Sequence, residues 1–398
     1  MKVMMLGWEL PPHNSGGLGV ACRQLAQALN HSGADIDFIL PYRADHKFDF
    51  MRVHAAVDVE PSVYSMTGVY DSRYYLNQDG HLQLGLHDQQ LMYAENVARL
   101  AEKLDFDIIH AHDWLTFRAA LRARQVKRRP LILHVHSIER DRAGGKSGNP
   151  FVREIEENAM LGADLVYAVS ERTRQMIIQD YHIPADKIDV AHNSIDTLMY
   201  DQLTDENEYR YLTELKKDGW KVVANVGRMT IQKGLPHLLD AAKRVVEYQP
   251  RTLFLLVGDG EQRDELIELA AARGISRNVI FAGFQRGARW RDAYAIADLF
   301  VMPSVSEPFG LTPLEAAFHG TPSLISWQSG VSELFKNSLK VDYWDVNLMA
   351  DKIIGALRSE AFINELGNNA QTEVNFYSWR PTADKIFSRY QSFAGSRA

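Results

Sequence analysis

The amino-acid sequence contains a single cysteine, Cys22, so an internal disulfide bond is excluded. This scarcity of cysteine is typical of proteins that fold in a reducing compartment, and we expect a cytoplasmic protein. Long hydrophobic runs are also lacking. The apolar stretch from Met1 to Gly7 is too short for a signal peptide or a membrane span and is expected to be the first strand, so we predict no integral membrane association.

The chain also lacks an excess of basic residues. Lysine and arginine number 44 against 51 aspartate and glutamate residues, and the net charge of −7 argues against nucleic acid as a partner. A length of 398 residues, 46% of them hydrophobic, suits two domains better than one core. The glycine-rich stretch at Gly16, Gly17 and Gly19 lacks the spacing of the dinucleotide-binding fingerprint and of the Walker P-loop. Dehydrogenases and P-loop hydrolases are therefore disfavoured.

Apolar runs of strand length alternate with helical patterns in both halves of the chain, which predicts parallel sheets covered by helices on both faces. In the first half the expected strands are Lys2–Leu6, Asp35–Leu40, Asp107–Ala111, Leu131–Val135 and Leu165–Val169. In the second half they are Lys221–Gly227, Thr252–Val257, Val279–Ala282, Leu299–Met302 and Pro322–Ile325. Residues 51–87, with the turn signal Asp79-Gly80, are expected to add strands at the edge of the first sheet.

The predicted fold class is therefore α/β, with two doubly wound, Rossmann-like domains and a cleft between the carboxyl edges of their sheets. We expect an amino-terminal domain over residues 1–195 and a carboxyl-terminal domain over residues 196–377. Residues 193–219 are polar and are interpreted as a linker with a short helix. A last helix within residues 378–398 follows a Trp379-Arg380-Pro381 break and is expected to cross back to the first domain.

The most informative segment follows the expected strand Leu299–Met302. Glu307 then lies beyond the carboxyl end of a parallel strand, where open α/β sheets bind ligands. The backbone N–H groups of Phe309–Leu311 fall near the start of the next helix, where they can hold an anion. Glu315 lies within that helix and can face back to the same ligand. Because carboxylates accept hydrogen bonds from paired hydroxyl groups, the segment predicts a sugar-nucleotide site.

A second candidate segment follows the first strand of the second half. Gly227 permits a tight turn, and Arg228 and Lys233 place two cations at the end of the strand. Such cations stabilise the negative charge that develops on a diphosphate leaving group. Gly283 and Phe284 follow the third strand of this half and are candidates for contacts with a nucleotide base.

Two His-x-His pairs occupy positions 110/112 and 134/136. Residues i and i+2 of a strand share a face, so each pair can in principle chelate a metal, and a metal-dependent hydrolase is a rival interpretation. No third and fourth ligands are obvious in the sequence. We favour packing for His110 and His134 and a hydrogen bond from His136 to a bound sugar, with Asp113 and Trp114 lining the acceptor side.

With these residues assembled, the chain resembles the family-four retaining glycosyltransferases of the GT-B fold, and most of all bacterial and archaeal glycogen (starch) synthases and their close relatives. The resemblance runs through nearly the whole length and is carried by the segments Gly16–Gly19, His110–Trp114, His136–Glu139, Gly227–Gly234 and Glu307–Glu315. The chain departs from the family pattern in the interdomain loop, where Asn193-Ser194-Ile195-Asp196 replaces the usual Asn-Gly-Val-Asp. It is also shorter than typical bacterial glycogen synthases.

The resemblance implies a role for each matching residue on the diphosphate side. Arg228 and Lys233 would bind the nucleotide diphosphate. Gly17, next to Gly16, would approach its β-phosphate. His136 would contact the transferred sugar and support the developing positive charge.

The same resemblance assigns the glutamate segment to the sugar and the nucleoside. Glu307 would hold the hydroxyl groups of the transferred sugar, helped by backbone groups of Phe309, Gly310 and Leu311. Glu315 would bind the ribose hydroxyl groups.

Together these roles predict a hexosyltransferase that moves a hexose, expected to be glucose, from UDP-glucose or ADP-glucose to a hydroxyl acceptor with retention. The favoured acceptor is an α-1,4-glucan, and Asp113, Trp114 and Glu139 are the acceptor-side residues. A lipid, phosphosugar or small-sugar acceptor remains open, as does a nucleotide-sugar 2-epimerase of the same fold. No carboxylate is obviously placed for a covalent sugar intermediate, which favours a front-face route.

We expect no cofactor and no metal requirement, because the cations of Arg228 and Lys233 replace a metal as charge stabilisers. The Asp-x-Asp patterns at 35–37 and 105–107 hold a metal in some sugar transferases. Here they precede or begin expected strands, so we interpret them as solvated strand ends. The choice between UDP and ADP, the length of the acceptor and the oligomeric state stay open.

Overall fold

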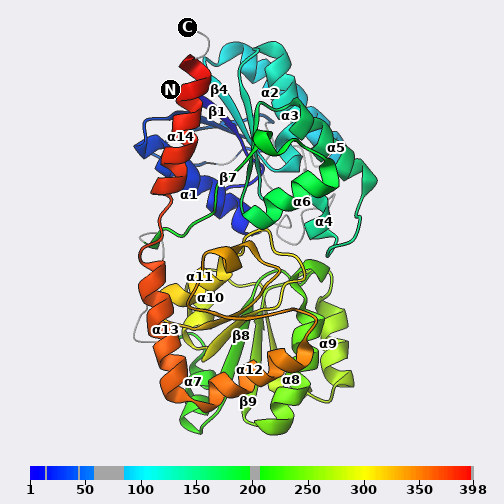
Figure 1. The fold of residues 1–398 in the computed structure, drawn as a ribbon, viewed down its shortest axis with the longest axis vertical. Helices are drawn as coiled ribbons and strands as arrows, with labels where there is room; N and C mark the ends of the chain where they lie inside the picture. Colours follow the sequence, from blue (N-terminus) through cyan, green and yellow to red (C-terminus); the bar gives the residue numbers. More distant parts are fainter. Residues whose placement is uncertain (14–15, 44, 58–84, 198–206, 396–398) are drawn as a thin grey trace. The chain divides into compact units, whose positions relative to one another are not determined.

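The computed structural model describes residues 1–13, 16–43, 45–57, 85–197 and 207–395. They form two compact units, each built on a parallel β-sheet (Figure 1). Unit 1 comprises Met1–Glu139, Ser147–Asn193 and Trp379–Ala398, and unit 2 comprises Arg140–Lys146 and Ser194–Ser378. The expected boundary at residue 195 assigns residues 140–146 to the first domain, whereas their contacts group them with unit 2.

The described residues of unit 1 form a seven-stranded sheet in the order β3-β2-β1-β4-β5-β6-β7, and every neighbouring pair is parallel. Its strands are β1 Lys2–Leu6, β2 Asp35–Leu40, β3 Arg52–Ala55, β4 Ile108–His112, β5 Leu131–Val135, β6 Leu165–Ala168 and β7 Ile188–Val190. The five predicted strands of this half are confirmed to within one residue. β3 is the part of the expected edge strands that the structure describes, and the turn signal Asp79-Gly80 lies outside the described residues.

Helices cover both faces of this sheet (Figure 1). They are α1 Gly17–His31, α2 Leu86–Lys103, α3 Trp114–Val126, α5 Pro150–Gly162, α6 Glu171–Tyr181 and α14 Arg380–Gly395. The short α4 spans Glu139–Arg142, and its residues 140–142 group with unit 2. Alternate residues of β1 face opposite layers, as a strand requires. Val3 and Met5 pack in the core cluster that includes residues of α1 and α14, while Met4 and Leu6 pack in the cluster that includes residues of α2 and α3.

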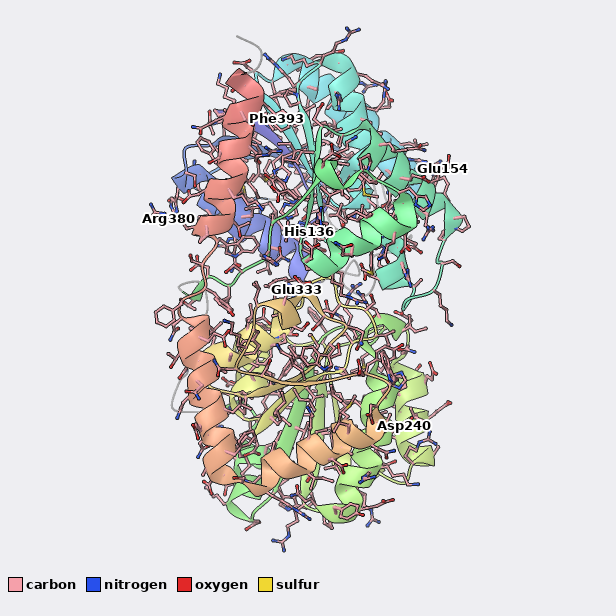
Figure 2. All side chains as sticks on the ribbon, in the orientation of Figure 1. His136, Glu154, Asp240, Glu333, Arg380 and Phe393 are labelled. Atoms are coloured by element: carbon pink, nitrogen blue, oxygen red, sulfur yellow. The ribbon has the colours of Figure 1, made fainter. Side chains whose placement is uncertain are left out.

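The last helix, α14, packs against unit 1 alongside α1 (Figures 1 and 2). Just before this helix, the indole N–H of Trp379 donates to Gln24 Oε1 at 2.7 Å, and within it the Thr382 hydroxyl donates to the carbonyl oxygen of His192 at 3.0 Å. Tyr390 is fully buried and hydrogen-bonds the ring of His110. The carboxyl-terminal helix therefore completes the hydrophobic core of the first unit, as the sequence predicts.

The described residues of unit 2 form a six-stranded parallel sheet in the order β10-β9-β8-β11-β12-β13. Its strands are β8 Lys221–Val226, β9 Thr252–Val257, β10 Val279–Gly283, β11 Leu299–Met302, β12 Ser323–Ser326 and β13 Leu339–Val341. Its helices are α7 Arg210–Lys217, α8 Leu235–Tyr248, α9 Arg263–Ala272, α10 Gly287–Ala295, α11 Thr312–Phe318, α12 Val346–Arg358 and α13 Glu360–Val374. Within the described residues of the chain, no helix is long and apolar enough to cross a membrane.

Both sheets reverse their winding direction once. In unit 1 the reversal lies between β1 and β4, and in unit 2 it lies between β8 and β11. Open α/β sheets bind ligands at such a switch point, in the crevice outside the carboxyl ends of the two strands. The loops after these four strands carry most of the residues that the sequence singles out, so the topology places the candidate residues of each unit at its own switch point.

Candidate functional site

The switch point of unit 2 is organised around the carboxylate of Glu307, which follows β11. Lys233, from the loop after β8, places its Nζ atom 2.6 Å from Glu307 Oε2. The hydroxyl of Ser304 donates to the same oxygen at 3.0 Å. The side chain of Glu307 is 8% exposed and that of Lys233 is 22% exposed. The structure thus brings together two of the four predicted catalytic residues as a largely buried ion pair.

The backbone on both sides of Glu307 is fixed by a neighbouring loop. The N–H of Glu307 donates to the Gln328 carbonyl oxygen at 2.9 Å, and the Glu307 carbonyl oxygen accepts from the N–H of Gly330 at 2.9 Å. The Phe309 carbonyl oxygen accepts from the N–H of Val331 at 2.7 Å. This bracing holds the carboxylate at the end of β11 without using its side-chain oxygens.

Gly310 is required by the geometry of the same loop. Its φ of +98° is a conformation that residues with a side chain rarely adopt, and an added Cβ would lie 2.9 Å from the Met302 side chain and 3.1 Å from Glu307. Within the described residues, the backbone N–H groups of Gly310 and Leu311 have no hydrogen-bond acceptor. These are the N–H groups that we predict to hold an anion, and this role stays a prediction; helix α11 itself has seven residues.

The turn after β8 is tightly packed. The N–H of Gly227 donates to the Val257 carbonyl oxygen at 2.9 Å, and an added Cβ on Gly258 would overlap the carbonyl oxygen of Gly227. Arg228 follows and is partly exposed. In the part of the chain that the structure describes, its guanidinium has no ion-pair or hydrogen-bond partner. Of the two predicted cations, Lys233 is thus paired with the Glu307 carboxylate, whereas Arg228 has no such partner among the described residues.

Glu315 lies in α11 and is buried. The hydroxyl of Tyr294, a fully buried residue of α10, donates to Glu315 Oε2 at 2.6 Å. This bond fixes the orientation of the carboxylate, as binding of a ribose diol would require. Gly283 ends β10 with a φ of +69°, and the ring of Phe284 is exposed with the guanidinium of Arg286 5.2 Å from its centre.

In unit 1 the glycine loop after β1 leads into α1. Gly16 is the N-cap residue of this helix, and the exposed Gly17 begins it. The N–H of Gly19 donates to Glu9 Oε1 at 3.1 Å, so one of the early helical N–H groups already has a carboxylate acceptor. Asn14 and Ser15 of the same loop lie outside the described residues.

The Asp113 carboxylate hydrogen-bonds to the loop that follows β5. It caps α3 with a φ of +63°, and its Oδ1 atom accepts from the backbone N–H groups of His136 and Ser137, each at 3.1 Å. The Ser137 hydroxyl donates to Oδ2 at 3.2 Å. A non-glycine residue in this conformation is uncommon, and here three hydrogen bonds compensate the strain. The carboxylate therefore holds the backbone at His136 in place, and its contact with an acceptor stays a prediction.

The two other predicted acceptor-side residues, Trp114 and Glu139, are also buried. Trp114 is 2% exposed and packs in the core of unit 1, so it does not line an open surface. Glu139 is buried, and its Oε1 atom accepts from the N–H of Asn149 at 2.8 Å. The Glu139 carboxylate thus holds the backbone of the loop at Asn149. The sequence could not distinguish these roles, because burial depends on elements distant in the chain.

The rings of the four histidines of the His-x-His pairs form one cluster at β4 and the end of β5. His112 lies opposite His134 in the strand register, and the two rings lie 5.3 Å apart. Within each pair the ring centres are 4.6 Å apart. His110, His112 and His134 are fully buried, while His136 is partly exposed. The burial of His110 and His134 agrees with the packing role that the sequence favours for them.

The imidazole rings of this histidine cluster are neutral. Burial, with a smaller contribution from the nearby His110, lowers the pKa of His136 to about 3. Burial likewise holds the pKa values of His110, His112 and His134 well below the usual value of histidine. His136 therefore offers a hydrogen bond, not a positive charge, at the carboxyl end of β5.

Several residues of these sites carry no sequence signal that identifies them. Ser304 precedes Glu307 by three positions, but a serine in a loop is common. Tyr294 acts on Glu315 from a different helix.

The Asp-x-Asp pattern at 35–37 is not the solvated strand end that we expected, because Asp37 is buried and bonded to the side chains of Arg52 and His54.

Comparison with known proteins follows the division into two halves. Residues 15–197 match the model described as Glycosyltransferase Family 4, and residues 212–373 match the model described as Glycosyl transferases group 1. A D-inositol 3-phosphate glycosyltransferase of Nocardia farcinica is 31% identical over 74% of this chain and 69% of its own length. The chain is a family 4 glycosyltransferase.

Other relatives match the transferase over a larger share of its length. An uncharacterized glycosyltransferase of Methanocaldococcus jannaschii is 28% identical over 98% of both chains. A glycogen synthase of Mycobacterium tuberculosis is 26% identical over 85% of this chain and 80% of its own length. The predicted enzyme class is thereby confirmed.

Solved structures match the whole transferase. Sucrose-phosphate synthase from Thermosynechococcus elongatus has a TM-score of 0.77 at 19% identity, covering 99% of both chains. The catalytic domain of starch synthase IV from Arabidopsis thaliana, bound to ADP and acarbose, has a TM-score of 0.75 at 18% identity over 99% of both chains. An Anabaena protein in complex with UDP and glucose has a TM-score of 0.74 at 20% identity, covering 98% of this chain and 99% of that one. These likenesses establish the GT-B fold.

Proposed function

We propose that this transferase moves glucose from a nucleoside diphosphate glucose, UDP-glucose or ADP-glucose, to an α-1,4-glucan with retention of configuration. The observation that carries the proposal is the arrangement at the switch point of unit 2. Lys233 is held by the Glu307 carboxylate at 2.6 Å, while Arg228 has no partner among the described residues. The adjacent loop supplies two N–H groups without an acceptor there, from Gly310 and Leu311.

This arrangement suits a diphosphate leaving group. Arg228 and Lys233 would bind its oxygens, and their charges stabilise the departing diphosphate more than the ground state, because its negative charge grows as the sugar bond breaks. When Lys233 turns to the phosphate, Glu307 is released to accept hydrogen bonds from sugar hydroxyl groups. Glu315, oriented by Tyr294, would bind the ribose diol. No step of this scheme needs a metal, so the metal-independent route stays our prediction.

Retention follows from a front-face route. The acceptor hydroxyl approaches the side from which the diphosphate departs, and a phosphate oxygen takes its proton. We expect His136, as a neutral ring, to donate a hydrogen bond to the sugar.

The proposed donor agrees with the ligands of proteins that share the fold. The Anabaena structure is in complex with UDP and glucose, and the starch synthase is bound to ADP and acarbose. A glucan acceptor is favoured by the similarity to glycogen synthase over most of the chain. A phosphorylated polyol is the second candidate acceptor, because the 31% identical relative is named for D-inositol 3-phosphate.

The test follows the anomeric proton of the product by NMR. The enzyme is incubated with UDP-glucose or ADP-glucose and either a maltooligosaccharide or inositol 3-phosphate. An α-linked product from the α-linked donor is expected, and a β-linked product would contradict the front-face route. Transfer to inositol 3-phosphate alone would keep the donor chemistry and replace the glucan acceptor. A changed sugar nucleotide in the absence of an acceptor would indicate the 2-epimerase alternative instead. Glu307→Gln serves as the control that should abolish transfer.

A further inference from the structure

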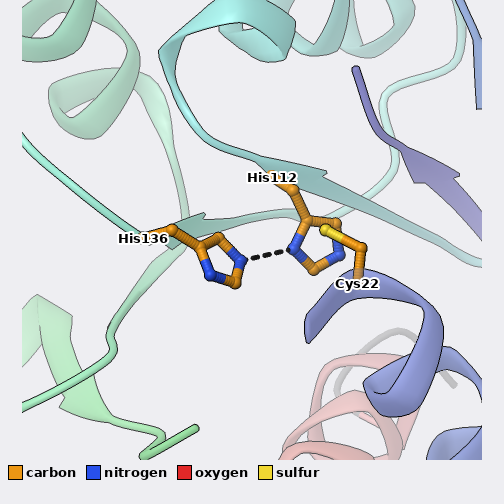
Figure 3. A group of neighbouring side chains, drawn as sticks. All are labelled: Cys22, His112 and His136. Carbon is orange, nitrogen blue, oxygen red and sulfur yellow. Dashed lines mark hydrogen bonds between the residues drawn. The ribbon is translucent and has the colours of Figure 1, made fainter. Parts of the chain in front are cut away.

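Three side chains of unit 1 converge beside the carboxyl ends of β4 and β5 (Figure 3). Cys22 comes from α1, His112 ends β4, and His136 follows β5. One ligand atom from each residue, the sulfur or a ring nitrogen, lies within 4.8 Å of the other two. The rings are already joined, since His112 Nδ1 and His136 Nε2 are 3.0 Å apart.

An unsatisfied nitrogen at the same place points to a missing ligand. The Nε2 atom of His112 is buried and has no hydrogen-bond partner among the described residues. Buried polar atoms almost always have a partner, and each exception calls for an explanation such as an ion. Hydrophobic packing explains the burial of the ring but not this nitrogen.

The donor set selects a class of metal. Thiolate and imidazole are preferred ligands of Zn²⁺ and related transition metals, whereas Mg²⁺ and Ca²⁺ prefer oxygen ligands. Bond lengths of roughly 2.0–2.3 Å in a tetrahedron separate ligand atoms by about 3.3–3.8 Å. Side-chain rotations that move the atoms by about 1 Å therefore close the present cluster around an ion. Three protein ligands leave a fourth position for water, and the partly exposed His136 provides the route of entry.

We propose that Cys22, His112 and His136 bind one Zn²⁺-like transition-metal ion, and that the bound ion inhibits the transferase by drawing the ring of His136 toward Cys22 and His112. The inhibition rests on the proposed function, in which His136 donates a hydrogen bond to the donor sugar. Binding deprotonates Cys22, and its proton leaves to solvent. The ion is thus not a cofactor of transfer, and a chelator should restore full activity.

Metal binding is tested first without reference to activity. Untagged full-length protein is stripped with a chelator and titrated with Co²⁺ and then Zn²⁺. We expect one equivalent to bind, with the near-ultraviolet absorption of a cobalt–thiolate bond that Zn²⁺ displaces. Because Cys22 is the only cysteine of the chain, any such band identifies this residue in the wild-type protein itself. Absence of the band would overturn the proposal.

Variants then define the ligand set. Cys22→Ser keeps the volume of the buried side chain and should remove the thiolate band and weaken Zn²⁺ binding at least ten-fold. His31→Ala, an exposed histidine of the same helix, is the matched control and should bind as the wild type does. Equal Zn²⁺ affinity in the wild type and in Cys22→Ser would contradict the site.

Inhibition is measured as nucleoside diphosphate release with chelator and with added Zn²⁺. The wild type should lose activity in Zn²⁺ as the site fills, whereas Cys22→Ser should match the wild type in chelator and resist Zn²⁺. Full activity with one bound equivalent would overturn the inhibition and leave the metal site standing. No diphosphate release even in chelator would instead refute the proposed function, while the cobalt spectrum still decides the site.

Discussion

Replacing Lys233 by alanine should affect stability and catalysis by different amounts. The ion pair with Glu307 spans 2.6 Å, and its side chains are 22% and 8% exposed. Removing one partner of a fully buried pair costs roughly 3–5 kcal/mol, because the other charge is left buried. The partial exposure of Lys233 and the hydroxyl of Ser304 reduce this cost, so we expect a loss of about 1–3 kcal/mol. Loss of one stabiliser of the leaving group should lower kcat by about 100- to 1000-fold.

The second variant separates the two effects. In Lys233→Ala/Glu307→Gln the buried carboxylate is neutral, so the free energy of unfolding in urea should recover at least half of the loss. Activity should not recover. Lys217→Ala removes an exposed pair, with side chains 66% and 69% exposed, and should change stability by less than about 0.5 kcal/mol.

The assays are urea unfolding and the rate of diphosphate release at saturating donor. A folded Lys233→Ala enzyme with kcat within ten-fold of the wild type would refute the role of Lys233 in stabilising the leaving group. A double variant no more stable than the single variant would refute the assignment of the stability loss to an unpaired buried carboxylate.

Three further predictions concern unit 2. Gly258→Ala should destabilise unit 2 by more than about 2 kcal/mol in urea unfolding, because φ is +142° and the added Cβ would overlap a backbone oxygen. The control Gly274→Ala, at φ +74° with open space around the added Cβ, should cost only about 1 kcal/mol. Equal losses in the two variants would contradict the steric argument. Tyr294→Phe removes the 2.6 Å hydrogen bond to Glu315 and should raise the donor KM about five-fold with kcat nearly unchanged, whereas an unchanged KM would remove the glutamate from donor binding. Burial lowers the pKa of His319 to about 4, so the unfolded chain takes up a proton before the folded protein does as the pH falls below about 6.5. Between pH 6.5 and 4 the free energy of unfolding should therefore fall by up to about 1.4 kcal/mol per pH unit. His319→Gln should flatten this pH dependence, and an unchanged slope would contradict the prediction.

The sequence predicts the strands well where the residues are continuously apolar. β9 and β11 are found at their predicted bounds because both are buried and, apart from Thr252, consist of apolar residues. The three-residue strands β7 and β13 are missed, since so short a run carries no recognisable pattern. The strand ends fix the loops, so the sequence places Lys233 and Glu307 beyond the carboxyl ends of β8 and β11. That these two strands are neighbours at a switch point is known only from the order of the sheet.

Side-chain partners are less predictable from the sequence. The pattern identifies Glu315 but not Tyr294, whose hydroxyl reaches it from the preceding helix. It also favours acceptor contacts for Asp113 and Trp114, which the structure uses to hold a loop and to fill a core. Such roles depend on which elements pack together, and a single sequence does not encode that choice locally.

The most direct test of the account is to count glucan growth against diphosphate release. The enzyme is supplied with UDP-glucose or ADP-glucose, with and without a maltooligosaccharide, and the glucan products are resolved by mass. We predict that the glucan gains one hexose for each diphosphate released from one of the two donors. Diphosphate release without glucan growth would contradict the acceptor assignment, and failure to use either donor would contradict the proposed function.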